Sequence, residues 1–209
     1  MKLNRYLFII SILFFPSKAF NQAPCDSSSF KQLISFQESV RITDDDLNKC
    51  CHIVDSLLEN NCTYFILKRE FYNQFTLTTI FGDICIKANS INSVKAYINY
   101  YLKNRNSPEE QLQYSLGEIF AKRPKDVLNE IVMCNSSERE QLLFGLALGL
   151  CGTYNNISPI DTINYQNKFF SINTEIIKIY PHFKKEIDFT LNQIKNILVF
   201  TIKMENENK

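Results

Sequence analysis

The sequence contains no tryptophan, five glycines and two histidines among its 209 residues. So few glycines favour helices over sandwiches of many strands, because tight β-turns depend on glycine. Two histidines leave little room for nucleophilic catalysis, since each Ser-His or Cys-His site needs one of them as its base. These scarcities favour a helical protein and disfavour the common hydrolase classes.

Sequence patterns typical of catalysis and metal binding are also missing. The chain has no Gly-x-Ser-x-Gly turn, Walker loop, His-Glu-x-x-His or dinucleotide-binding glycine motif. It has no Cys-x-x-Cys pair, which disfavours a structural zinc site. Asp44, Asp45 and Asp46 lack the glycine and the distant glutamate of a helix-loop-helix calcium site. We therefore expect no catalytic residue, no cofactor and no metal.

Long apolar runs are missing too, and the most apolar segment is at the N-terminus. Lys2 and Arg5 precede a mainly apolar stretch from Tyr6 to Phe15, and a small-residue cleavage site ends at Ala19. This is the layout of a secretory signal peptide. The stretch is far shorter than the roughly 18 to 20 apolar residues that span a bilayer. We expect a secreted or periplasmic protein without stable membrane insertion after cleavage.

Neither sign of charge dominates the chain. It has 23 lysines and arginines against 22 aspartates and glutamates. Loss of residues 1–19 removes three basic side chains and no acidic one, which leaves 20 positive against 22 negative charges. This balance offers no electrostatic footprint for nucleic acid, so another protein is the expected partner.

All the cysteines follow the expected cleavage site, so in an oxidising compartment they are candidates for disulfide bonds. Their odd number means that at least one thiol is free, buried or bonded to another chain. Alternatively, several are small core residues, because unpaired cysteine is often buried. The candidates are Cys25, Cys50, Cys51, Cys62, Cys85, Cys134 and Cys151.

Helix-start signals recur along the chain. Ser107-Pro108 starts a predicted helix that reaches Lys122, Pro124 starts a second helix, and Ser137 caps a third. Each carries apolar residues at helical spacing. Further helices are predicted after Thr43, over Asn92–Leu102, over Ile163–Tyr180 and from Pro181. Cys134 and Cys151 fall near the C-terminal ends of successive predicted helices. Antiparallel packing would place these two ends roughly 20 Å apart, which is too far for a disulfide, so we expect no bond between them.

One segment, from Phe75 to Lys87, admits two interpretations. Its β-branched residues on either side of Gly82-Asp83 are typical of a β-hairpin with a two-residue turn. We favour a helix, because the flanking stretches are helical and an isolated hairpin needs a partner sheet.

These patterns predict an all-α protein. We expect a signal peptide over residues 1–19, a single domain over residues 20–203 and a polar tail over residues 204–209. The domain would contain about eight short helices in a helical-hairpin array similar in architecture to HEAT and TPR repeats, without their consensus residues. Mostly helical structure with one β-hairpin near residues 75–87 is the alternative.

The leading functional hypothesis is a non-enzymatic module that binds another protein, and an immunity or inhibitor protein is one form of it. Tyr97, Tyr100 and Tyr101 are the tentative interaction surface, with half-buried core aromatics as the alternative. A second hypothesis is an enzyme with a non-standard site between Asp44 and His52. A third is a carrier whose apolar pocket is lined by some of the 17 phenylalanines.

Overall fold

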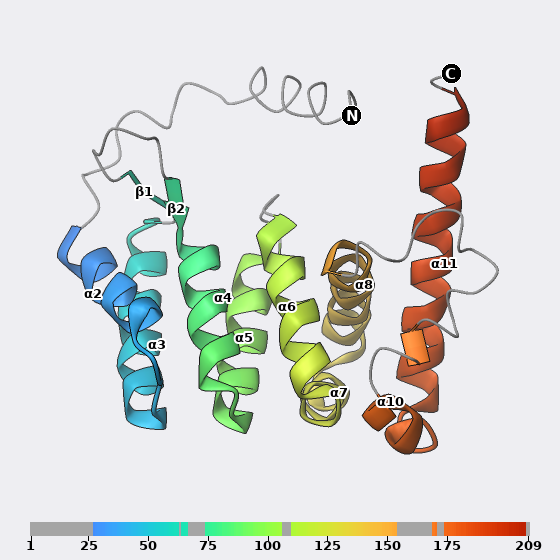
Figure 1. Ribbon diagram of the computed structural model, residues 1–209, viewed down its shortest axis with the longest axis horizontal. Coiled ribbons are helices and arrows are strands. Elements are labelled where there is room, and N and C mark those ends of the chain that lie inside the picture. The colour runs from blue at the N-terminus through green and yellow to red at the C-terminus, as the bar shows by residue number, and fades with distance from the viewer. Residues whose placement is uncertain are drawn as a thin grey trace.

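The apolar stripes of the sequence lie on helices that stand side by side in a row (Figure 1). The computed structural model describes residues 27–62, 64–66, 74–105, 110–153, 169–170 and 174–207. These residues form an all-α array of helical hairpins, as predicted, and the repeat type stays a prediction. The helices are α2 (Ser27–Glu38), α3 (Asp44–Glu59), α4 (Leu77–Ala88), α5 (Ile91–Asn104), α6 (Glu110–Lys122), α7 (Pro124–Met133), α8 (Ser136–Thr153), α10 (Thr174–Ile179) and α11 (Lys184–Glu207).

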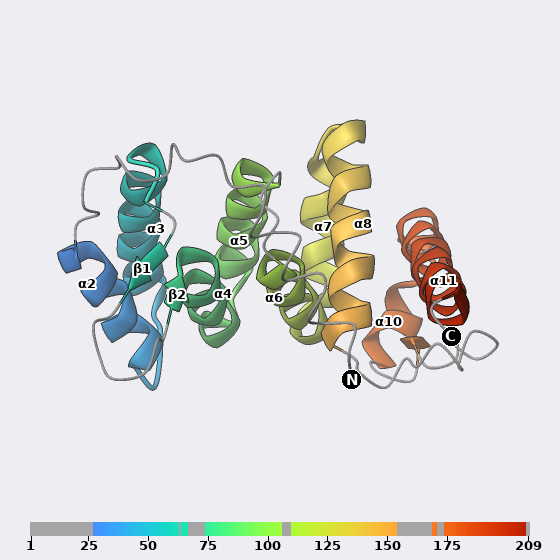
Figure 2. The same cartoon turned by 90° about the horizontal axis from the view of Figure 1, so that it is seen from above.

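The helices of the array form two layers. Seen from above, α3, α5 and α7 make one row and α2, α4 and α6 make the other (Figure 2). Helix α4 packs on α2, α3, α5 and α6, so it holds the first half of the array together. Helix α8 packs on α6 and α7 and joins them to α11 at the far end. Among the described helices, none has an apolar stretch of the length needed to cross a bilayer.

Local capping explains where several helices begin. The Thr43 side chain accepts a hydrogen bond from the Asp46 backbone, and the Asp46 carboxylate accepts one from the Thr43 backbone, which makes the capping box of α3. Ser90 forms the equivalent box at the start of α5. Pro124 occupies the first turn of α7, where its missing N–H costs nothing. The predicted starts near Thr43 and at Pro124 are confirmed.

Two predicted starts are wrong by a few residues. Asn135 caps α8 in place of Ser137, because its Oδ1 accepts a hydrogen bond from the Glu138 backbone at 3.0 Å. Pro181 lies in a turn, and α11 begins only at Lys184. Helix α11 continues to Glu207 and so includes part of the expected polar tail. Of the predicted helix over residues 163–180, the structure describes residues 169–170 and 174–180, and α10 lies in the second of these stretches. The expected cap Ser107 lies outside the described residues.

From Leu77 onward, the segment Phe75–Lys87 adopts the favoured helix rather than the hairpin, and its first two residues belong to strand β2 (Gln74–Thr76). Helix α4 runs through Gly82 and Asp83 without a turn. A Cβ on Gly82 would lie 2.3 Å from the Ser115 Oγ, so the glycine allows α4 and α6 to approach closely. A short antiparallel ribbon instead precedes α4, where β1 (Tyr64–Ile66) pairs with β2 (Gln74–Thr76).

The hydrophobic core runs along the whole array, and it contains the stripes that helical spacing predicts. These buried residues are Leu47, Val54 and Leu57 of α3; Leu112, Leu116, Ile119 and Phe120 of α6; Val127, Leu128 and Ile131 of α7; Leu142, Leu143, Leu146 and Leu150 of α8; and Ile187, Leu191, Ile194 and Leu198 of α11.

Helices α6 and α8 approach so closely that only glycine fits between them. A Cβ on Gly149 would lie 2.0 Å from the Gln113 carbonyl oxygen and 3.1 Å from the Gly117 nitrogen, both of which are backbone atoms. One turn earlier in α8, a Cβ on Gly145 would lie 1.8 Å from the hydroxyl of Tyr101, which belongs to α5. Glycine in α8 therefore serves packing, at the expense of helix propensity.

Candidate functional site

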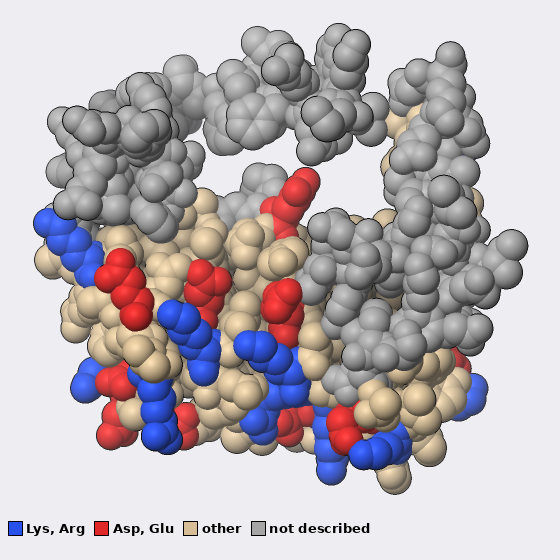
Figure 3. Space-filling view, viewed as in Figure 1, with Lys and Arg blue, Asp and Glu red and all other residues tan. Residues whose placement is uncertain are grey.

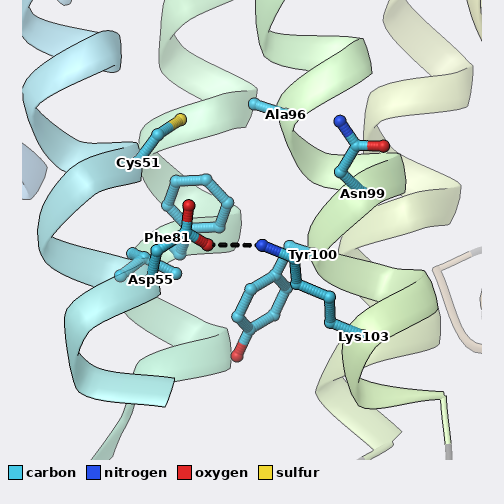
Figure 4. Close-up of a pocket in the computed structure, with 8 residues that line it drawn as sticks. Cys51, Asp55, Phe81, Ala96, Asn99, Tyr100 and Lys103 are labelled. Atoms are coloured by element: carbon cyan, nitrogen blue, oxygen red, sulfur yellow. Dashed lines mark hydrogen bonds and ion pairs between the residues drawn. The ribbon is translucent and has the colours of Figure 1, made fainter. Parts of the chain in front are cut away.

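A hollow lies between α3 and α5, and α4 forms its floor (Figure 4). We call it the α3–α5 groove. Its cavity has a volume of about 110 Å³. It is lined by Cys51, Val54 and Asp55 of α3, Phe81 of α4, and Ala96, Asn99, Tyr100 and Lys103 of α5.

The two helices that flank the groove run in the same direction and are joined near both ends. At one end Asp44 accepts hydrogen bonds from the Asn92 amide at 2.9 Å and from the Ser90 hydroxyl at 3.0 Å. At the other end the Lys103 ammonium donates to the Asp55 carboxylate at 2.6 Å. The partners in each helix-to-helix pair are 48 residues apart in sequence. The groove is the stretch left open between these two joints.

The floor of the groove is fixed by buried aromatic rings. The Phe81 and Tyr100 ring centroids are 5.2 Å apart, and their planes are tilted by 59°. The Tyr100 hydroxyl is hydrogen-bonded to the Thr78 hydroxyl of α4 at 2.8 Å. Because both rings are packed and the hydroxyl is engaged, the floor is rigid and presents mainly carbon.

The rim of the groove is polar and open to solvent. The side chains of Asp55 and Lys103 are 50% and 57% exposed. Asn99 is exposed as well, and within the described residues no hydrogen bond occupies its amide. The rim therefore offers one carboxylate, one ammonium and one amide next to an apolar floor.

The Cys51 thiol lines the groove but is not chemically activated there. Burial raises its pKa, and Asp55 raises it further, whereas Lys103 acts in the opposite direction. Burial also raises the pKa of the neighbouring Cys50 to about 12. A thiol with a raised pKa stays protonated near neutral pH and is a poor nucleophile.

The residues of the expected non-standard enzyme site do not meet at one place. Asp44 is bonded to the start of α5, at the end of α3 away from Asp55. His52 is exposed, whereas Cys51 is half-buried and lines the groove. Adjacent helix residues diverge by about 100° around the axis, which explains the separation of Cys51 and His52. Among the described residues, no group of three histidine, cysteine or acidic side chains is arranged to hold a metal ion.

Tyr97, Tyr100 and Tyr101 do not form the predicted exposed surface, because all three side chains are buried, and Tyr100 contributes only to the floor of the groove. Tyr97, Tyr100 and Tyr101 are 0%, 4% and 4% exposed. The Tyr97 hydroxyl donates to the Leu112 carbonyl at 2.9 Å, and burial raises its pKa well above the usual range. Gly145 leaves the space that the Tyr101 hydroxyl fills. The alternative interpretation, core aromatics, is correct.

The candidate cysteines differ in state. Cys50, Cys51, Cys85, Cys134 and Cys151 are free thiols, so Cys134 and Cys151 are not bonded to each other, as expected. Cys62 is disulfide-bonded. Cys25 lies outside the described residues.

The basic side chains around Pro124 bind the end of α4. The Arg123 guanidinium donates to the Asn89 carbonyl at 2.8 Å, and the Lys122 ammonium lies 3.3 Å from the Ile86 carbonyl. Asn89 ends α4 in the left-handed conformation. These contacts satisfy carbonyls at a helix C-terminus, where cations are favoured.

Sequence reasoning missed the polar rim of the groove, which consists of Asp55 on α3 and of Asn99 and Lys103 on α5. The one signal for the pair Asp55 and Lys103 is a constant spacing between α3 and α5, because Lys103 follows Asp55 and Asn92 follows Asp44 by the same number of residues. The residues of β1 and β2, which lie between α3 and α5 in the sequence, have no helical periodicity. This spacing is therefore hard to recognise from the sequence. No family model, curated protein or solved structure matches the chain.

Proposed function

We propose that this protein is a non-enzymatic helical module that binds another protein outside the cytosol, in the secreted or periplasmic space. The observation that carries the proposal is the α3–α5 groove, an open hollow with a rigid aromatic floor and a polar rim. An apolar floor surrounded by polar groups is the composition of a protein-binding pocket.

The surface charge supports a protein partner. On the described part of the face in Figure 3, basic and acidic side chains are interspersed and no field of one sign forms. Figure 3 views the side formed by α2, α4 and α6; in the other row, oppositely charged side chains of neighbouring helices are paired, Asp55 with Lys103 and Glu130 with Lys95. A nucleic-acid partner needs a concentration of positive charge.

The dimensions of the groove favour a side chain over a carried ligand. Its cavity of about 110 Å³ is smaller than the roughly 300–1,000 Å³ of typical small-molecule pockets. Phe81 is its single lining phenylalanine, so it is not the phenylalanine-lined pocket of the carrier hypothesis. A cavity of this size suits one anchoring side chain of a partner.

Site-specific photo-crosslinking tests the proposal in the native organism. A photoreactive benzoylphenylalanine at His52, an exposed α3 residue adjacent in sequence to the groove residue Cys51, should cross-link to one defined protein. The same group at Gln141, which is exposed on α8, is the matched control and should not. The purified partner should then bind the unmodified protein with saturation.

The contrary outcome is equally definite. Equal cross-linking from both positions, or no saturable binding by the purified protein, would show that the groove is not a protein-binding site. Recovery of the unprocessed chain from the cytoplasm would contradict the proposed location.

A further inference from the structure

The mouth of the groove already holds a cation next to a carboxylate. The Lys103 ammonium lies 2.6 Å from the Asp55 Oδ1. Both side chains are at least half exposed, so the pair contributes little to stability. The lysine stem is flexible and its ammonium hydrates strongly, so another cation can replace it at small cost.

The other polar groups of the groove add acceptors to this carboxylate. The Asn99 amide, which has an oxygen acceptor, lies across the gap from Asp55 and Cys51 (Figure 4). The Phe81 and Tyr100 rings also line the groove. The Tyr100 hydroxyl is engaged with Thr78, so the aromatic floor adds carbon and ring electrons.

We propose that the α3–α5 groove anchors an arginine side chain of the protein partner, with the guanidinium bound to Asp55 and the Asn99 oxygen in place of Lys103. This inference rests on the proposed function and names the chemistry that the groove recognises. A guanidinium has five N–H donors in a planar fork, which pairs with a carboxylate through two bonds and packs well on aromatic rings.

The same groups disfavour an anion. A carboxylate that bound Lys103 would be held close to Asp55, because the two groove side chains are themselves 2.6 Å apart. Like charges at that separation repel each other. Lys103 is the single basic residue in the groove lining, whereas Asp55 and the Asn99 oxygen both accept hydrogen bonds.

The direct test is a nuclear magnetic resonance titration of the full-length processed protein with N-acetyl-arginine amide. Saturable shifts should appear at the backbone amides of Asp55 and Asn99. N-acetyl-citrulline amide has nearly the same shape without the charge, and it should bind at least about tenfold more weakly, since a charged partner is lost. Equal binding of both probes would refute recognition of a guanidinium.

Two variants distinguish a cation site from an anion site. Lys103→Met keeps the apolar stem but removes the competing ammonium, so arginine should bind about twofold to fivefold more tightly, the range set by an exposed ion pair. Asp55→Asn should weaken binding at least about tenfold. Asp45→Asn, an exposed position at the start of the same helix, is the control and should change nothing. Circular dichroism should show unchanged helix content in all three variants.

The remaining outcomes overturn the inference. If Lys103→Met weakens binding of the arginine probe, the guanidinium does not take the place of Lys103, and if N-acetyl-glutamate amide produces the same shifts, the groove recognises an anion. If no probe gives saturable shifts, the groove has no arginine site. Cross-linking from His52 reports separately on the proposed function, so a partner that still cross-links there would leave that function intact while the arginine anchor is rejected.

Discussion

Replacement of Gly149 by alanine should destabilise the protein, although the same change usually stabilises a helix. Alanine is favoured over glycine in a helix by about 1 kcal/mol. Here the added Cβ would lie 2.0 Å from the Gln113 carbonyl oxygen and 2.8 Å from its carbon. These are backbone atoms of α6, so no rotation of a side chain can relieve the contact, and the two helices must separate.

The magnitude follows from the balance of these effects. Overpacking of a core costs typically about 1–3 kcal/mol and occasionally more, and a backbone contact this short belongs at the upper end. The gain in helix propensity offsets about 1 kcal/mol of that loss. We therefore expect Gly149→Ala to lower the free energy of unfolding by about 2 kcal/mol.

Equilibrium urea denaturation followed by circular dichroism measures this difference. The control compares Gln141→Ala with Gln141→Gly, at an exposed position of the same helix, α8. There the alanine variant should be more stable than the glycine variant by about 1 kcal/mol through helix propensity alone. Glycine is thus expected to be the better residue at position 149 and the poorer one at position 141. A Gly149→Ala protein as stable as the parent would refute the close packing of α6 on α8.

Three further predictions concern the core, a helix cap and the thiols. Leu116→Ala should lower the free energy of unfolding by about 2–5 kcal/mol, because this fully buried side chain would leave a cavity; an unchanged urea midpoint would contradict its place in the core. Thr43→Ala should cost about 1 kcal/mol near neutral pH through loss of the α3 cap. Hydrogen bonds from Thr43 hold the pKa of Asp46 below its usual value, so their contribution is present above the unfolded pKa and is lost as the pH falls through the folded one. The cost of Thr43→Ala should therefore shrink in acid, and a pH-independent difference would show that Asp46 takes no part. Iodoacetamide should modify Cys51 before Cys85, since Cys85 is 1% exposed and burial holds its pKa well above the usual range; mass spectrometry of peptides that finds the opposite order would contradict the arrangement of α3 and α4.

The helix starts show where sequence reasoning identifies the right capping residue and where it selects a wrong one. Thr43 could be identified as a cap because its partner, Asp46, is three residues away and the whole interaction lies within one turn. Ser137 was an equally suitable cap by sequence, yet Asn135 supplies the oxygen that binds the Glu138 backbone. The sequence therefore offers two capping residues two positions apart, and the structure uses the first of them. Pro181 shows the same effect, since it is accommodated in a turn before α11.

The tyrosines show what pattern alone leaves open. Helical spacing places Tyr97 and Tyr101 on one face of α5, but it does not say what covers that face. Helix α6 supplies the carbonyl that binds Tyr97, and glycine in α8 supplies the space for Tyr101. Both partners lie on other helices, so the sequence of α5 could not show whether its tyrosines are exposed.

The sequence by itself determined the all-α class, the apolar stripes and most helix limits, because caps and helical periodicity act within a few residues. Only the tertiary structure decided which helices became neighbours. It brought Asp55 opposite Lys103 across a separation of 48 positions, placed Phe81 beneath them and made Gly149 indispensable to the contact of α6 with α8. The groove exists because two parallel helices are joined near their ends and held apart between them, and such an arrangement depends on packing among segments that have no local interaction with one another.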